Sequence, residues 1–263
     1  MLAAERHNRI MVAMRSRGAA SITDLAGDLG VSVSTLRRDL DFLSAAGLLQ
    51  RTRGGAVADI RQAKTFEPPA IVSGGLASAE KRAIGQDAAQ QIKSGQIVLF
   101  DSGTTTLEAA RAAVALRLQF TAITNDLQIA ALLTHQPGID VIVLGGMVRS
   151  GTPTILGSAT LDFLSRLSVD LLMLGAHAVH DGRLSDTSME LAALKRCMIT
   201  ISETRLLLVD SGKFARCSFA TFGDVSDFHQ IITDDALSPE ARASMSEQSL
   251  KVVRLPSASG RVS

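Results

Sequence analysis

The sequence predicts an all-α N-terminal unit that ends in a small β-hairpin, followed by a larger open α/β sheet. In the first sixty residues, apolar side chains recur every three or four positions, as on one face of a helix. From Glu80 onward, short apolar runs alternate with helical segments, which is typical of a sheet with parallel strands. Charge also divides the chain of 263 residues: residues 1–64 hold 10 Lys+Arg against 6 Asp+Glu, whereas the remainder holds 17 against 20. We therefore expect two unequal domains, of which the basic one suits a polyanionic partner.

Composition excludes several classes of protein. With 46% hydrophobic and 20% charged residues, the chain has too much apolar material to be disordered. No stretch approaches the ~18 apolar residues of a membrane helix, and the N-terminus lacks the apolar block of a secretory signal, so we expect a cytoplasmic protein. Cys197 and Cys217 are too few and too far apart for a disulfide framework or a zinc site, and the five histidines lack HxxxH spacing. We expect no metal and no cofactor.

Three helical segments are predicted in the N-terminal unit. The first covers about Ala4 to Arg17, and the second begins at Ser21, whose hydroxyl can cap the free backbone amides. Gly30-Val31 then interrupts the pattern, and Ser32 can cap the third helix. Two short helices joined by a glycine-containing turn, after a supporting helix, form the helix-turn-helix arrangement.

The polar face of the third helix indicates how this arrangement is used. Its first two turns carry the candidate DNA-binding residues Ser32, Ser34, Thr35, Arg37 and Arg38. Arginine can pair bidentately with guanine in the major groove, and hydroxyls can hold phosphates. The alternative is the solvated face of an ordinary three-helix bundle.

The following segment, residues 48–57, alternates apolar and basic residues toward a Gly-Gly turn, which predicts a β-hairpin. Beside a recognition helix such a hairpin is a wing that can reach the DNA backbone or the minor groove. Its candidate DNA-binding residues are Arg51, Thr52, Arg53, Gly54 and Gly55.

The N-terminal unit resembles the winged helix-turn-helix of the DeoR family of bacterial transcription regulators. Three stretches carry this resemblance, which is gapless over about fifty residues: Glu5 to Ile10, Gly30 to Leu40 and Arg51 to Ala56. The resemblance implies a DNA-binding domain over residues 3–58 that binds double-stranded operator DNA through the third helix and the wing.

Residues 59–79 contain Pro68-Pro69 and Gly74-Gly75 with little periodicity, and we expect a linker there. Residues 80–255 are expected to form the open α/β sheet. The strands are predicted at residues 96–100, 120–124, 141–144, 171–174, 206–209 and 231–232. Ligands of such sheets bind at the carboxyl ends of the strands.

The strand ends therefore supply the candidate ligand-binding residues. The first predicted strand is followed by Asp101, Ser102, Gly103, Thr104, Thr105 and Thr106 and then by a helix. Such a loop gathers hydroxyls and free amides where a phosphate can bind, although the same residues could serve only as a helix cap. It is neither GxGxxG nor GxxxxGK[ST], which disfavours dinucleotides and nucleoside triphosphates. Further candidates at or near the strand ends are Asn125, Gly145, Gly146, His177, Glu190, Lys195 and Lys213.

This half is similar to the effector domain of DeoR regulators, whose fold is related to ribose phosphate isomerases and sugar phosphate deaminases. The similar stretches are residues 80–85, 101–106, 124–125, 144–146, 193–196 and 210–214. The resemblance implies a phosphorylated sugar or polyol effector, with its phosphate in the loop from Ser102 to Thr106. It also implies that Asp101, Asn125, Lys195 and Lys213 surround the rest of the effector. Residues 6–8 and 159–163 resemble glycerol phosphate repressors.

The sequence departs from the family in the effector domain. Where the family usually has Gly-Ala-Asp-Gly, residues 175–178 read Gly-Ala-His-Ala. Where it usually has a glutamate, this chain has Leu191, with Glu190 about 100° around the helix. Gly212 and Ala215 stand where Ser and Gly are common in the family. The identity of the effector therefore does not follow from a relative.

Three candidate functions are considered for this sequence. A repressor of a sugar or polyol catabolic operon, released by its effector, fits both halves and needs no catalytic group. A sugar phosphate isomerase or deaminase with an accessory N-terminal domain needs a carboxylate base, for which Glu190 and Asp101 are the candidates. An RNA-binding regulator is disfavoured because the chain has no Trp or Tyr on which bases could stack. We expect a non-enzymatic, homo-oligomeric (dimeric or tetrameric) DNA-binding regulator.

Overall fold

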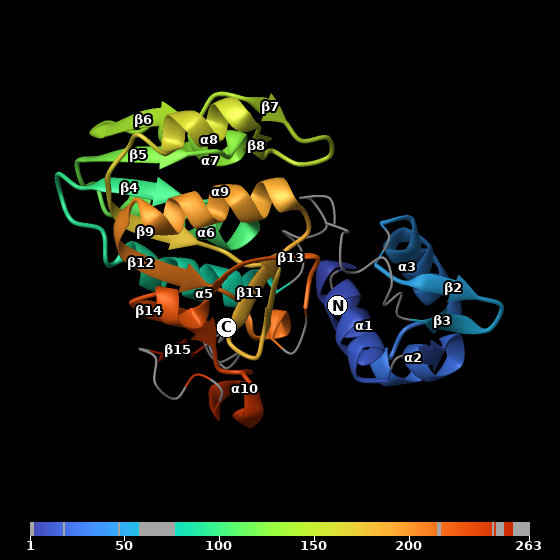
Figure 1. Cartoon of the computed structure of the whole chain (residues 1–263). Helices are drawn as coiled ribbons and strands as arrows, with labels where there is room; N and C mark the ends of the chain where they lie inside the picture. The colour runs from blue at the N-terminus through green and yellow to red at the C-terminus, as the bar shows by residue number, and fades with distance from the viewer. Residues whose placement is uncertain are drawn as a thin grey trace. The chain divides into compact units, whose positions relative to one another are not determined.

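The computed structural model describes residues 3–17, 19–46, 48–57, 77–214, 217–243, 245 and 250–254 (Figure 1). The chain divides into two compact units, Met1–Ser78 and Ala79–Ser263. Most of the expected linker, residues 59–76, lies outside the described residues, and helix α5 (Ser78–Ala89) already begins within its last residues. In the described part of the chain, no helix is both long enough and apolar enough to cross a membrane.

The N-terminal unit contains the three predicted helices and the wing. Its elements are α1 (Ala3–Arg17), β1 (Ala19–Ser21), α2 (Ile22–Leu29), α3 (Val33–Ala45), β2 (Gln50–Thr52) and β3 (Gly55–Val57). The predicted caps are confirmed, because the Ser21 and Ser32 hydroxyls each accept a backbone N–H bond of 3.1 Å at the start of α2 and α3. Gly30, in the left-handed conformation with φ 63°, ends α2. The apolar faces of the helices meet in one small core, where Ile10, Met14, Leu25, Leu36, Leu40 and Leu43 are fully buried.

The winged helix-turn-helix is confirmed with one addition that makes the unit more than all-α. Strand β1 pairs with β3, so that the wing becomes a three-stranded antiparallel sheet in the order β1-β3-β2. Three residues are too few to show the alternation by which a strand is predicted from sequence. Gly55 pairs with Ser21, and a Cβ at Gly55 would lie 2.1 Å from the carbonyl oxygen of Ala20. The second glycine of the wing is therefore required by the pairing of β1 with β3.

The second unit is built on a parallel sheet, which the described residues form from seven strands in the order β15-β14-β12-β9-β4-β5-β6. Its strands are β4 (Ile97–Phe100), β5 (Phe120–Thr124), β6 (Ile139–Val143), β9 (Val169–Leu174), β12 (Ser202–Leu208), β14 (Gln230–Asp234) and β15 (Leu250–Val253). All of their pairings are parallel. The six strands that the sequence predicts are confirmed, and β15 is an addition.

Helices cover both faces of this sheet (Figure 1). One face packs against α5, α6 (Thr104–Ala115) and α7 (Leu127–Leu133), and the other against α8 (Ser158–Leu164) and α9 (Met189–Thr200). Successive strand residues point to opposite faces: Val98 and Phe100 lie in one core and Leu99 in the other. Burial on both faces explains why these strands appear in the sequence as continuous apolar runs.

Several short elements of this unit were not predicted. They are the hairpin β7 (Met147–Val148) and β8 (Ile155–Leu156), the antiparallel sheet of β10 (Ala178–His180), β11 (Arg183–Asp186) and β13 (Ala220–Asp224), the short helices η1 (Ser211–Lys213) and η2 (Val225–Asp227), and α10 (Pro239–Ala243). Each has two to five residues, which is too short for a periodic signal.

The order of the parallel strands places a switch point at the centre of the sheet. The chain enters at β4, adds β5 and β6 on one side, and then returns to add β9, β12, β14 and β15 on the other side. The loop after β4 therefore leads to α6 on one face of the sheet, and the loop after β9 leads to β10 on the other face. In open α/β sheets, ligands bind at the carboxyl ends of the strands at such a point.

Candidate functional site

The polar face of α3 is presented to solvent. Ser32, Ser34, Arg37 and Arg38 are exposed and Thr35 is half-buried. The Ser32 hydroxyl lies 2.9 Å from the Ser34 hydroxyl and 2.8 Å from the Thr35 hydroxyl, so the three form one cluster at the helix start. Two guanidinium groups and a hydroxyl cluster on the second helix of a helix-turn-helix can contact bases and phosphates.

The wing residues divide into two groups. Thr52, Arg53 and Gly54 are exposed at its tip. Arg51 instead forms an ion pair with Asp41 of α3 and donates a hydrogen bond of 3.3 Å to the carbonyl oxygen of Arg37. Arg51 therefore joins the wing to α3. Gly55 is buried where β3 pairs with β1. The exposed cation of the wing is Arg53.

A buried carboxylate fixes α3 against α1. Asp39 is 5% exposed and accepts hydrogen bonds of 2.8 Å from Arg6 Nη2 and from His7 Nε2. The His7 ring also stacks on Phe42 with 4.8 Å between the ring centres. Burial by itself would raise the pKa of Asp39, but the hydrogen bonds and charges of Arg6 and His7 outweigh it and lower that pKa. This contact holds the helix that presents Arg37 and Arg38.

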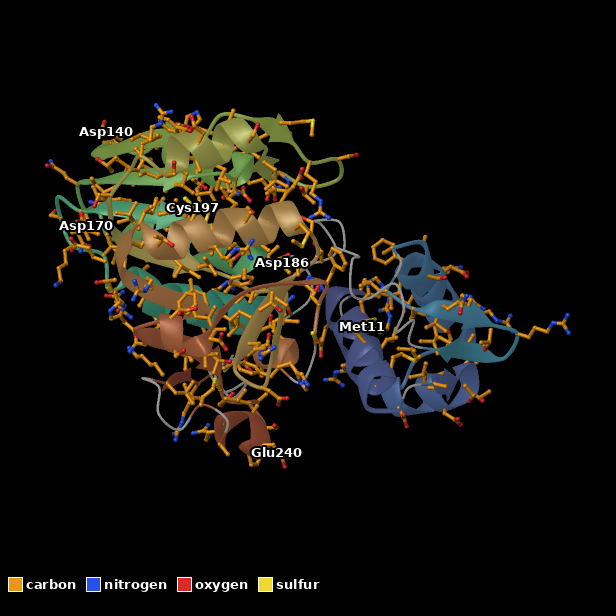
Figure 2. The ribbon with its side chains drawn as sticks, viewed as in Figure 1. Met11, Asp140, Asp170, Asp186, Cys197 and Glu240 are labelled. Carbon is orange, nitrogen blue, oxygen red and sulfur yellow. The ribbon has the colours of Figure 1, made fainter. Side chains whose placement is uncertain are left out.

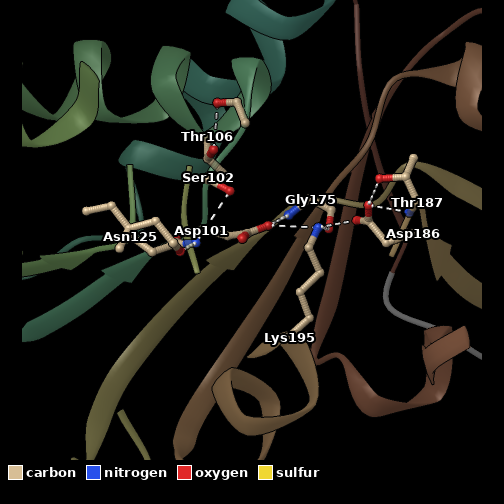
Figure 3. Close-up of polar contacts among 10 residues, drawn as sticks. Asp101, Ser102, Thr106, Asn125, Gly175, Asp186, Thr187 and Lys195 are labelled. Atoms are coloured by element: carbon tan, nitrogen blue, oxygen red, sulfur yellow. Dashed lines mark hydrogen bonds and ion pairs between the residues drawn. The ribbon is translucent and has the colours of Figure 1, made fainter. Parts of the chain in front are cut away.

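In the second unit, a buried lysine lies at the switch point between β4 and β9 (Figure 3). Lys195 Nζ of α9 lies 3.0 Å from Asp101 Oδ2, which follows β4, and 2.8 Å from Asp186 Oδ2, which ends β11 (Figure 2). The same nitrogen donates a hydrogen bond of 2.8 Å to the carbonyl oxygen of Gly175. An ammonium group has three N–H donors, so these three acceptors use all of them. Lys195 therefore links α9 to the residues that follow β4 and β9 and to the end of β11.

Burial disfavours the charged form of each group in this cluster. The direction in which the pKa is finally shifted differs among the three groups. For Lys195 the attraction of Asp101 and Asp186 outweighs burial and raises its pKa. For Asp186 the charges of Lys195 and His177 also outweigh burial, and its pKa is lowered. For Asp101 burial outweighs the attraction of Lys195, and its pKa is raised. With all three groups ionised, the Asp101–Lys195–Asp186 cluster carries a net charge of −1.

The loop after β4 leads into α6 at Gly103, where no side chain caps the helix. Thr105 and Thr106 are buried, and the Thr106 hydroxyl donates a hydrogen bond of 2.8 Å to the Gly103 carbonyl. Ser102 and Thr104 are half-buried. The groups that can meet an anion here are thus the hydroxyls of Ser102 and Thr104 and the backbone amides of the first helical turn.

Asp126 lies beside this loop at the start of α7. Its Oδ1 accepts backbone bonds of 2.8 Å from Gln128 and 3.1 Å from Ile129, and its carboxyl also receives a backbone hydrogen bond from Gly103. Burial raises the pKa of Asp126 despite these bonds.

Two buried oxygens near the cluster have no hydrogen-bond partner within the described part of the chain. They are Asp101 Oδ1 and Asn125 Oδ1, and both residues are 0% exposed. Asn125 Nδ2 is occupied, since it donates to the carbonyl oxygen of Ile155 at 3.4 Å and to the Ser102 hydroxyl at 3.5 Å (Figure 3). Two acceptors are therefore available where β4 and β5 end.

Gly145 and Gly146 follow β6, and packing requires a glycine at the second of these positions. The carbonyl oxygen of Gly145 accepts a hydrogen bond of 2.7 Å from the Thr160 hydroxyl. Gly146 has φ 151°, and a Cβ there would lie 2.2 Å from Thr160 Oγ1. Gly146 therefore lets the loop after β6 approach α8, whereas a Cβ at Gly145 would meet no atom within 4 Å.

The other sequence candidates are His177, Lys213 and Glu190. His177 is half-buried after β9 and close enough to Asp186 to lower its pKa. Lys213 is half-buried in η1, which follows β12 at the same edge of the sheet. Glu190 is exposed, whereas Leu191 is 3% exposed and lies one helical turn before Lys195. The structure thus places Leu191, and not Glu190, on the face of α9 that carries Lys195.

The sequence analysis missed Asp186 and its surroundings. The backbone N–H of Thr187 donates a hydrogen bond of 2.7 Å to Asp186 Oδ1, and Arg149 donates one of 3.2 Å to the Thr187 hydroxyl. No local motif marks these residues, because β11 belongs to a short antiparallel strand group that the sequence does not predict. Among the residues that the structure describes, no set of three or more His, Cys, Asp or Glu side chains could hold a metal ion.

Comparison with known proteins follows the same division of the chain. Residues 6–62 match the model of the DeoR-like helix-turn-helix domain, and residues 76–235 match that of the DeoR C terminal sensor domain. The chain is 31% identical to the HTH-type transcriptional regulator GlpR of Haloferax volcanii, over 96% of this chain and 98% of that protein. It is 32% identical to the glycerol-3-phosphate regulon repressor of Escherichia coli K12, over 88% and 90% of the two chains.

Two further comparisons concern a second regulator and a solved structure. The putative aga operon transcriptional repressor of Escherichia coli O157:H7 is 30% identical, over 95% of this chain and 93% of that protein. Ribose 5-phosphate isomerase A from Methanocaldococcus jannaschii has a TM-score of 0.40 and 15% identity, over 53% of this chain and 55% of that chain.

Proposed function

Since the chain belongs to the DeoR family of DNA-binding transcriptional regulators, we propose that it represses a sugar or polyol catabolic operon and is released by a phosphorylated sugar or polyol. The observation that carries this proposal is the combination of two sites in one chain. The exposed Arg37 and Arg38 of α3 suit operator DNA, and a helix start without a side-chain cap at the switch point of the sheet suits a phosphate. Relatives named glycerol-3-phosphate regulon repressors support a small phosphorylated polyol.

The switch-point residues support a sensor rather than an isomerase or deaminase. Proton abstraction from a sugar needs a carboxylate held over the substrate carbon. Asp101 is bound to Lys195 through one oxygen, Glu190 is exposed, and Leu191 occupies the position on α9 one turn before Lys195. This arrangement agrees with relatives that are named as transcriptional regulators.

Replacing Arg37 or Arg38 by alanine is expected to weaken operator binding by about 1–3 kcal/mol where the lost contact reads a base. Loss of a phosphate contact would instead weaken binding to all sequences alike and reduce the salt slope by about one. The measurement is fluorescence anisotropy on a DNA fragment that the wild type selects from a randomised pool. Arg111→Ala, which removes an exposed arginine of the second unit, is the matched control. Unchanged affinity in both α3 variants would contradict the assignment.

The regulator is further proposed to be a homo-oligomer joined through its second unit. A single recognition helix contacts too little DNA for a specific site, and two-fold dimers that read half-sites about 34 Å apart are the usual solution. Sedimentation equilibrium of the full chain should give a dimer or a tetramer. A monomer that still bound its operator with nanomolar affinity would overturn this part of the proposal.

A further inference from the structure

The two residues with unpartnered oxygens at the switch point, Asp101 and Asn125, directly follow neighbouring strands. Phe100 pairs with Thr124 in the register of β4 and β5, so Asp101 and Asn125 occupy the next matched positions. Both residues are 0% exposed, and each keeps one oxygen without a donor in the described part of the chain. Buried acceptors in native proteins are nearly always satisfied, so an unpaired one calls for an explanation.

The neighbouring protein donors are already committed to other acceptors. The backbone N–H of Gly175 donates to Asp101 Oδ2, not to Oδ1. The three N–H groups of Lys195 serve Asp101 Oδ2, Asp186 Oδ2 and the Gly175 carbonyl (Figure 3). A bound molecule or water can supply the donors that satisfy Asp101 Oδ1 and Asn125 Oδ1.

The charge around these oxygens restricts what that molecule can be. The Asp101–Lys195–Asp186 cluster carries a net charge of −1 when ionised, so it repels an anionic group placed against Asp101. Ser102 follows directly, and the start of α6 at Thr104 favours an anion. A ligand that spans this short distance must present an anionic group to α6 and neutral hydrogen-bond donors to Asp101 and Asn125.

We propose that Asp101 and Asn125 set the specificity of the effector site by accepting hydrogen bonds from two hydroxyl groups of a polyol phosphate. The same two residues reject a phosphorylated sugar acid, because its carboxylate would meet two acceptors and a negative cluster. The inference rests on the proposed function, since it assumes that a phosphorylated sugar or polyol binds in this unit.

The test compares matched ligands by calorimetry on the full chain. Glycerol 3-phosphate is paired with 3-phosphoglycerate, and sorbitol 6-phosphate with 6-phosphogluconate, so that each pair differs in having an alcohol or a carboxylate at the far end. Propyl phosphate, which keeps the phosphate and lacks both hydroxyls, completes the set. At least one polyol phosphate should bind ten times more tightly than its acid partner, and glycerol 3-phosphate should bind more tightly than propyl phosphate.

Two variants test the named oxygens directly. In Asp101→Asn, the carbonyl oxygen can keep the bonds to Gly175 and Lys195, which places the new N–H donors where Oδ1 stood. We expect this variant to bind the polyol phosphate at least tenfold more weakly than the wild type does. Its preference for the polyol phosphate over the matched acid phosphate should become smaller or reverse. Asn125→Ala removes the second acceptor and should weaken the polyol phosphate while leaving the binding of propyl phosphate unchanged.

A third variant provides the control. Thr233 of β14 also has a buried, unpartnered oxygen and is 0% exposed, but β12 and β9 separate its strand from β4. Thr233→Val should therefore leave all affinities unchanged. Because the ratio of two affinities is measured within one variant, it stays informative when a variant is partly unfolded.

The outcomes separate this inference from the proposed function. If no phosphate compound binds the wild type, the proposed effector site is wrong and the inference falls with it. If the wild type binds polyol and acid phosphates equally, or if Asp101→Asn keeps the wild-type preference, the two oxygens do not select the effector. In that case the specificity assignment is overturned while the phosphate site stands.

Discussion

Replacing Lys195 by methionine is expected to lower the free energy of unfolding of residues 79–263 by about 3–5 kcal/mol. The side chains of Lys195, Asp101 and Asp186 are only 5%, 1% and 6% exposed. Removing the ammonium leaves two carboxylates buried beside each other without a cation, and neither can be solvated in place. At roughly 2–4 °C per kcal/mol for a unit of this size, the melting temperature should fall by about 6–20 °C.

Differential scanning calorimetry of the full chain measures this loss of stability. Two further variants serve as controls. Lys251→Met removes a lysine that is 46% exposed and paired with one carboxylate, Asp87, at 2.7 Å, and it should cost about 1 kcal/mol or less. Adding Asp101→Asn and Asp186→Asn to Lys195→Met makes the whole cluster neutral and should restore much of the stability. A melting temperature of Lys195→Met close to that of the wild type would show that the cluster does not hold the switch point together.

Thr104→Glu is expected to abolish the response to the effector while operator binding is retained. Thr104 is the first residue of α6, so the new carboxylate would occupy the helix start where the phosphate is proposed to bind. A negative side chain at this position is itself favoured by the helix dipole by about 0.3–1 kcal/mol, so the unit should remain folded. The residues proposed to bind the operator lie in the other unit and are unchanged.

The readout is operator affinity with and without the polyol phosphate that the wild type binds. The wild type should show a coupling energy of roughly 1–3 kcal/mol, which is a change in affinity of about 5- to 150-fold, and Thr104→Glu should show none. Thr104→Gln has the same size without the charge and should keep a measurable response. A normal response in Thr104→Glu would place the phosphate elsewhere in the unit.

Features that depend on nearby residues could be predicted from the sequence. The caps at Ser21 and Ser32 follow from hydroxyls placed directly before apolar periodicity, and both are present. The strands of the central sheet were found because burial on both faces leaves an uninterrupted apolar run. The stretch from Asp101 to Thr106 was identified as a candidate phosphate loop because its residues are consecutive, although the helix already begins at Thr104.

Features that depend on distant residues could not be predicted in this way. Asp186 reaches Lys195 through an antiparallel strand that is too short to leave a pattern, and Asp39 reaches Arg6 across 33 positions of the chain. Arg51 was predicted to contact DNA, but nothing in its neighbourhood reveals the ion pair with Asp41. The orientation of Glu190 away from Lys195 depends on the rotation of α9, which only the packed structure fixes.

The order of the strands also determines when the proposed effector site can form during folding. The central pair β4 and β9 joins residues such as Val98 and Leu171, far apart in the chain, whereas β4 and β5 are close neighbours in sequence. Closing a long loop costs chain entropy before any contact is gained, so pairings of this kind form slowly. The N-terminal unit is synthesised first and folds through contacts within its first sixty residues. The newly made chain should therefore form its N-terminal unit before β9 and α9 are available to assemble the proposed effector site.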